Sequence, residues 1–192
     1  MVVTDPKRAF ECSQVVAHIT LAEKHLEEGR NLIDGDPVQA SEKLYKAAGG
    51  CVKALAPYLN LEEIVVEAEE RGRWTATELE KAVLRAAQKI GEWILGSWNH
   101  AWALHVWGFH EANLDAEDIR ARLPYIEKIV IETKKIISAK YRVSLKSLQH
   151  LCTIVIQQHR PFATNSYISV LLHNVENKTL NKIFLYQTTK VI

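Results

Sequence analysis

The sequence lacks the features that mark membrane and secreted proteins. Its 192 residues include only three cysteines, Cys12, Cys51 and Cys152, which are far apart and form no Cys-x-x-Cys pair. No apolar run reaches the ~18 residues of a transmembrane helix. The N-terminus carries charges and a proline where a signal peptide needs an apolar stretch. We therefore expect a cytoplasmic protein without membrane association, whose cysteines are small buried residues.

Motifs for nucleophilic catalysis and phosphate binding are also missing. The chain has no Gly-x-Ser-x-Gly, and Gly49-Gly50 stands within a helical pattern without a Gly-Lys-Ser context. The net charge of +1 gives no general basis for nucleic-acid binding, which usually requires a basic excess. We expect no cofactor.

Charge is distributed very unevenly along the chain. Of the 24 Lys and Arg residues, 17 lie in residues 1–138 and 7 in residues 139–192, whereas the 23 acidic residues divide into 22 and one, Glu176. Alanine is common before residue 138 and rare after it, and all five tryptophans lie before it. This contrast predicts two parts, a domain over residues 1–138 and a tail over residues 139–192.

The tail permits several interpretations. Residues 166–172 and 182–186 are β-branched and aromatic runs that favour a hairpin, whereas residues 145–158 are compatible with a helix. The abrupt change of composition is also what a frameshift or read-through would produce. We therefore assign no function to the tail.

The domain is punctuated by helix signals and contains no strand signal. Asp5-Pro6 and Asp36-Pro37 are helix starts, and Asn60 to Glu63 and Thr75 to Glu78 have the pattern of capping boxes. Asp115 opens the last segment, in which Pro124 either kinks or restarts the helix. The predicted helices cover about residues 6–33, 37–57, 61–72, 76–107 and 115–138. This pattern predicts an all-α, up-and-down bundle of about five helices.

The longest predicted helix, residues 76–107, has two apolar faces. Leu79, Val83 and Ala101 share the expected core face, whereas Trp98 and Trp102 lie on a second face together with Leu84, Gly91 and Leu95. The second face either packs in the core or meets another copy of the chain. The candidate homodimer interface is Leu95, Trp98 and Trp102.

Three histidines, His100, His105 and His110, follow one another at intervals of five residues. In an α-helix this interval points successive side chains to different faces, so these residues predict no metal site. Gly108 is the expected end of the helix, so His110 and Glu111 project from that end.

Three segments of the domain resemble one known family. EEGRNLIDGDPVQASEKLYKAA (27–48), RGRWTATELEKA (71–82) and LHVWGFHEANLD (104–115) are similar to the archaeal PaREP family, type one. That family is largely uncharacterised and resembles the HEPN superfamily of helical bundles. The resemblance implies a HEPN-like fold, frequent homodimerisation, and association with nucleotidyltransferases or RNA.

The catalytic motif of HEPN ribonucleases is absent. Those enzymes use Arg-x(4–6)-His, and no arginine of this chain stands at that distance before a histidine. The primary hypothesis is therefore a non-catalytic module that binds a partner protein, a nucleotide or RNA as a homodimer. The alternative is a divergent, metal-independent ribonuclease or nucleotide-processing enzyme of a toxin–antitoxin-like system. Its candidate catalytic residues are Asn99, His105, His110 and Glu111, with Arg71 and Arg73 as phosphate contacts.

Overall fold

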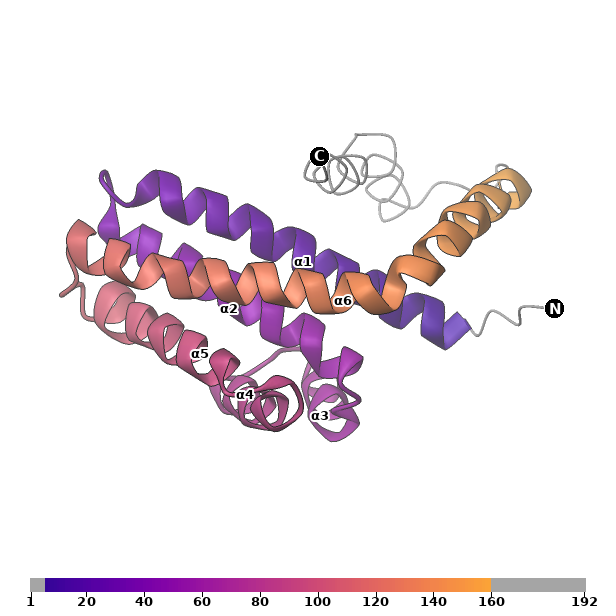
Figure 1. Cartoon of the computed structure of the whole chain (residues 1–192), viewed down its shortest axis with the longest axis horizontal. Coiled ribbons are helices and arrows are strands. Elements are labelled where there is room, and N and C mark those ends of the chain that lie inside the picture. Colours follow the sequence, from indigo (N-terminus) through magenta and orange to yellow (C-terminus); the bar gives the residue numbers. More distant parts are fainter. Residues whose placement is uncertain (1–5, 160–192) are drawn as a thin grey trace, which may run out of the picture. The chain divides into compact units, whose positions relative to one another are not determined.

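The computed structural model describes the backbone of residues 6–159 and the side chains of residues 13–139. The described residues form six α-helices and one π-helical segment and contain no strand, which confirms the all-α prediction (Figure 1). The chain divides into two compact units, Met1–Val143 and Ser144–Ile192. The hairpin predicted over residues 166–186 lies outside the described residues.

The first two helices follow their start signals. Helix α1 spans Pro6–Leu32 and α2 spans Pro37–Tyr58. At the start of α2, Asp36 accepts a hydrogen bond from the backbone N–H of Gln39 at 3.0 Å, and Pro37 occupies the first turn, where a missing N–H costs nothing. Helix α2 then packs against α1, α3, α4, α5 and the π-helical segment, which makes it the central helix of the bundle.

The capping box predicted at Asn60 is wrong. Helix α3 spans Glu62–Arg71, and its N-cap, Leu61, makes no side-chain capping bond. Asn60 instead adopts a left-handed conformation (φ 54°), and the N–H of Leu61 donates to the carbonyl of Ala56 at 3.0 Å. Asn60 therefore closes α2 rather than opening α3, a role that asparagine also suits.

The predicted helix over residues 76–107 is divided into three segments. Helix α4 spans Ala76–Ile90, α5 spans Trp93–Ala103, and the π-helix η1 spans Leu104–His110. The start is as predicted, since Thr75 and Glu78 form both bonds of a capping box. The break occurs at Gly91, whose φ of +101° is open to glycine and strained for other residues. The prediction of one continuous helix is therefore wrong, because Gly91 ends α4 rather than contributing to an apolar face.

The last helix, α6, spans Ala116–His159 and runs through Pro124 without restarting. Asp115 and Asp118 bond each other's backbone N–H groups at its start, at 2.9 and 3.3 Å. Helix α6 also places several isoleucines in the core. The largest fully buried side chains of the unit include Leu44, Leu55, Ile94, Trp98, Leu104, Ile119, Ile126 and Ile129. None of the described helices combines the length and apolar character that crossing a membrane requires.

Candidate functional site

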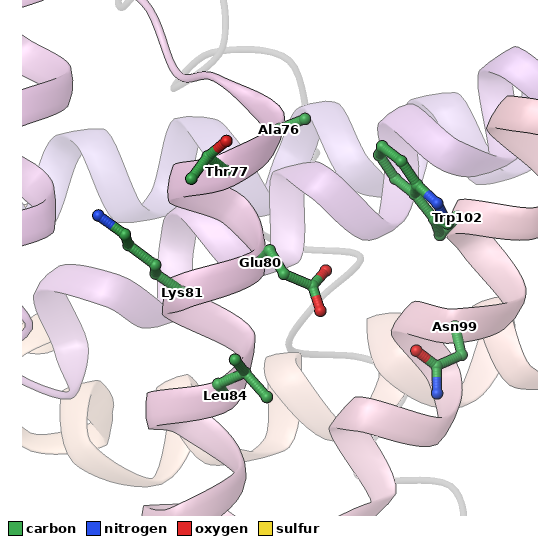
Figure 2. Close-up of a pocket in the computed structure, with 7 residues that line it drawn as sticks. All are labelled: Ala76, Thr77, Glu80, Lys81, Leu84, Asn99 and Trp102. Atoms are coloured by element: carbon green, nitrogen blue, oxygen red, sulfur yellow. The ribbon is translucent and has the colours of Figure 1, made fainter.

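A groove lies between α4 and α5, and we call it the α4–α5 groove. Its volume is about 420 Å³, within the range of sites that take a small ligand or one large side chain. One wall comes from α4 and the other from α5, and Figure 2 shows their side chains. The lining residues are Ala76, Thr77, Glu80, Lys81, Leu84, Asn99 and Trp102.

Glu80 supplies the acidic group of the α4–α5 groove. Its Oε2 accepts a hydrogen bond from Nε1 of Trp98 at 2.5 Å. Trp98 is completely buried, so its indole is fixed by core packing and holds the carboxylate in place. Of the two alternatives for Trp98, core or interface, the structure therefore shows the core. In Figure 2 the Glu80 carboxylate extends from α4 toward Asn99, whereas Lys81 points away.

Trp102 forms the aromatic wall of the groove. Its side chain is 40% exposed, although two rings hold it from within the chain. The ring centroids of Tyr45 and His105 lie 6.4 and 5.7 Å from that of Trp102. Trp102 therefore presents a large apolar surface to solvent while two rings support it from the protein side.

A chain of three titratable side chains lies behind Trp102, and we call Glu42, His105 and His110 the histidine chain. Oε2 of Glu42 lies 3.0 Å from Nδ1 of His105, and Nε2 of His105 lies 3.2 Å from Nε2 of His110. Lys46 pairs with the other oxygen of Glu42 at 3.2 Å. The expectation that residues five apart point to different faces is wrong here, because η1 is a π-helix, whose bonds run from residue i to i+5.

Proton positions in the histidine chain follow from the donors available. A carboxylate only accepts, so Nδ1 of His105 carries the proton that bonds Glu42. Nε2 of a neutral His105 is then an acceptor, and it receives the N–H of His110. The arrangement orients one imidazole through a carboxylate, as general-base sites do.

Tyr45 covers the histidine chain from α2. Its ring stacks on the imidazole of His105, with centroids 4.0 Å apart. Burial, with the nearby carboxylates of Glu42 and Glu80, raises the pKa of Tyr45 to about 12. Tyr45 is therefore a neutral packing group at physiological pH.

The prediction that the helix ends at Gly108 is wrong. Gly108 is buried within η1 and faces Ser41 of α2. A Cβ at this position would lie 2.6 Å from Cβ of Ser41, closer than real side chains approach. Gly108 therefore allows η1 to approach α2 closely enough for His105 to reach Glu42. The turn that follows η1 includes Ala112, whose φ is +53°.

The other candidate residues lie apart from the histidine chain. Arg71 is bound to the buried Glu78, and Arg73 is exposed. Glu111 accepts a hydrogen bond from the side-chain amide of Asn113 at 3.2 Å and is not a member of the histidine chain. Leu95 is half-buried.

His100 and Cys51 are packed against other parts of the bundle. His100 stacks on Tyr125 of α6 at 3.7 Å, and burial, helped by Arg122, lowers its pKa. Cys51 is fully buried, and burial raises the pKa of its thiol to about 12. Among the described side chains, no three His, Cys, Asp or Glu residues are grouped as a metal site requires.

Comparison with known proteins identifies the family. The family model described as the archaeal PaREP1/PaREP8 family matches residues 17–130. A crystal structure of a protein from Sulfolobus solfataricus is 37% identical, with a TM-score of 0.56 over 60% of this chain and 95% of that one. A solution structure of the same structural-genomics target is 36% identical, with a TM-score of 0.54 over 61% and 91% of the two chains. No curated protein matches the chain significantly. The chain belongs to the archaeal PaREP1/PaREP8 family.

Proposed function

We propose that this chain is a HEPN-like, non-catalytic helical module that binds a partner protein through the α4–α5 groove. Two copies form a homodimer that leaves each groove open. The observation that carries the proposal is the exposure of two large apolar side chains at the groove, Leu84 at 46% and Trp102 at 40%. Large aromatic side chains that are rigid and exposed are the usual anchors of protein interfaces.

Charge favours a protein partner over RNA. Residues 1–138 carry 22 acidic residues against 17 Lys and Arg residues. The acidic group that projects into the groove is the carboxylate of Glu80, and a phosphate backbone would be repelled by it. Of the two arginines considered as phosphate contacts, Arg71 is already bound to Glu78.

The test compares two exposed apolar residues on different helices. Leu84 lines the groove on α4, whereas Ile131 lies on α6 and is equally exposed, at 48%. The tagged full chain is recovered from its source organism as wild type, Leu84→Asp and Ile131→Asp, and co-purifying proteins are quantified. We expect a defined protein whose recovery falls at least about tenfold with Leu84→Asp and is unchanged with Ile131→Asp. Equal recovery with both variants would contradict the proposal.

The histidine chain supports a second candidate, a metal-independent ribonuclease or nucleotide-processing enzyme. The supporting observation is the orientation of His105 by Glu42, with His110 exposed at the end of the chain. Labelled RNA is incubated with the full chain in the presence of a metal chelator. Cleavage that is lost in His105→Gln and kept in the Trp107→Leu control supports the enzyme. If the wild type cleaves nothing between about pH 5 and 9, this candidate is rejected.

A further inference from the structure

We propose that the α4–α5 groove receives an arginine side chain of the partner protein, whose guanidinium pairs with Glu80 and stacks on the indole of Trp102. This inference rests on the proposed function, since it specifies the chemistry by which the groove recognises its partner. The groove combines a fixed carboxylate, an exposed indole and an amide within one cavity, and a guanidinium can interact with all three (Figure 2).

The carboxylate of Glu80 is held in position by a neutral donor, the indole N–H of Trp98. Its Oε2 is bound by the buried indole of Trp98, and Figure 2 shows the carboxylate extending from α4 toward Asn99 on the other wall. Among the residues whose side chains are described, no Lys, Arg or His forms an ion pair with Glu80. The two buried acidic residues of the described part, Glu42 and Glu78, are each paired with a cation. Glu80 is therefore a positioned carboxylate that no cation within residues 13–139 neutralises.

Trp102 supplies the surface on which a planar cation stacks. Tyr45 and His105 support its ring from the protein side, so the indole needs no reordering when a ligand arrives. A guanidinium over an indole face gains from the attraction between the cation and the ring. Because the two groups line one groove, a single side chain can meet both.

Asn99 adds an acceptor on the opposite wall from Glu80. Its side chain is exposed, and no hydrogen bond to it is found among the described residues. A guanidinium carries five N–H donors in one plane, enough to bind a carboxylate and an amide oxygen together. The lysine ammonium is compact and strongly hydrated, and it gains less from stacking on a ring. Arginine therefore fits this groove better than lysine does.

The experiment follows the indole N–H signals of the full chain, labelled with ¹⁵N at tryptophan. The probes are two blocked tripeptides, acetyl-Gly-Arg-Gly-amide and acetyl-Gly-Lys-Gly-amide, with guanosine monophosphate as a third arm. We expect the arginine peptide to shift the signals of Trp98 and Trp102 saturably, with a Kd in the millimolar range. The lysine peptide and the nucleotide should bind at least about fivefold more weakly.

Variants assign the binding to the groove. Glu80→Gln keeps the shape of the side chain and should weaken arginine binding about tenfold, because it removes the charge. Trp102→Leu should abolish it, whereas Trp107→Leu, which removes a 49% exposed indole outside the groove, should leave Kd unchanged. The indole spectrum of each variant reports whether it remains folded, and Glu80→Gln keeps the test decisive if Trp102→Leu does not fold.

Several results would overturn the inference. These are the absence of a saturable shift at either indole, equal affinity for the two peptides, tighter binding of the nucleotide, or an unchanged Kd in Glu80→Gln. If such a result occurs while recovery of a partner still depends on Leu84, the groove binds a protein without recognising arginine. If the peptide binds as expected while recovery is independent of Leu84, the proposed function fails and the arginine site remains.

Discussion

Nε2 of His105 and Nε2 of His110 lie 3.2 Å apart, within one helical segment. This contact exists because residues 104–110 form a π-helix, in which residues five apart stand above one another. Short π-helical segments are rare and are often found at functional sites. In this molecule the segment joins two histidines, and Glu42 of α2 then orients the first of them.

The proton position on His105 is directly measurable. Because Glu42 only accepts hydrogen bonds, we predict that neutral His105 carries its proton on Nδ1, whereas a free imidazole favours Nε2. Long-range ¹H–¹⁵N correlation spectra of the imidazoles distinguish the two tautomers. Glu42→Gln should shift the equilibrium toward Nε2, and a wild-type His105 protonated only on Nε2 would contradict the assignment.

Gly108 should be intolerant of any side chain. Because a Cβ there would meet Cβ of Ser41 at 2.6 Å, Gly108→Ala should lower the free energy of unfolding by about 1–3 kcal/mol in urea denaturation. Gly96→Ala is the matched control, since a Cβ at that position would have no neighbouring atom within 4 Å. In the interior of α5 this substitution should raise stability by about 0.5–1 kcal/mol.

Adding Ser41→Gly to Gly108→Ala tests the cause of the destabilisation. The second substitution removes the atoms that the new methyl group meets, so the double variant should recover part of the lost stability. If the changes in the free energy of unfolding caused by Ser41→Gly and Gly108→Ala are additive in the double variant, the contact between η1 and α2 is not the cause of the destabilisation.

Stability should fall in mildly acidic solution. Burial and, to a smaller extent, the Lys53 ammonium lower the pKa of His18 from its ordinary value of 6.5. The unfolded chain therefore takes up a proton on His18 at a higher pH than the folded chain does. The stabilisation that results is complete above pH 6.5 and is lost as the pH falls below it. The pKa values of His25 and His100 are lowered in the same direction, also mainly by burial.

Urea denaturation at about pH 7.5 and about pH 5 measures this dependence. The free energy of unfolding of the wild type should fall between the two, and His18→Gln should show a smaller fall because it removes one of the titrating groups. A fall of equal size in the two proteins would show that His18 does not contribute.

The expected homodimer is tested by light scattering on the full chain. We predict a mass of about twice 21.8 kDa. Trp102 was one of three residues considered for the dimer interface, but Trp98 is buried and Trp102 lines the groove assigned to the partner. Trp102→Asp should therefore leave the mass unchanged. A wild-type monomer would reject the homodimer, whereas a variant that dissociates would show that a second copy covers the groove.

Local signals in the sequence predicted the helix starts well, because capping is decided within four residues. Asp36 and Thr75 cap as predicted, and Gly72 ends α3 in the left-handed conformation. Asn60 was misinterpreted because it is equally suited to ending one helix and to starting the next. Gly91 was misinterpreted because a glycine inside an amphipathic pattern is compatible both with close packing and with a break.

The candidate site was only partly predictable for a different reason. His105 and His110 were identified, but their contact depends on a π-helix, which departs from the α-helical period that sequence patterns assume. Glu42, Tyr45 and Glu80 were missed, since their roles depend on packing between different helices: Glu42 and Tyr45 of α2 meet His105 of η1, and Glu80 of α4 meets Trp98 only because Gly91 breaks the helix between them. One available signal was the spacing of Glu42 and Tyr45, which places both on one face of α2.

Photo-crosslinking shows directly whether the α4–α5 groove is the contact site for a partner protein. A photo-reactive benzophenone side chain replaces Leu84 or, as the control, Ile131, which is equally exposed on α6. After irradiation in the source organism, mass spectrometry identifies the crosslinked proteins. We predict one defined protein crosslinked from position 84 and not from position 131. Crosslinks from position 84 only to a second copy of this chain, or equal patterns from both positions, would contradict this prediction.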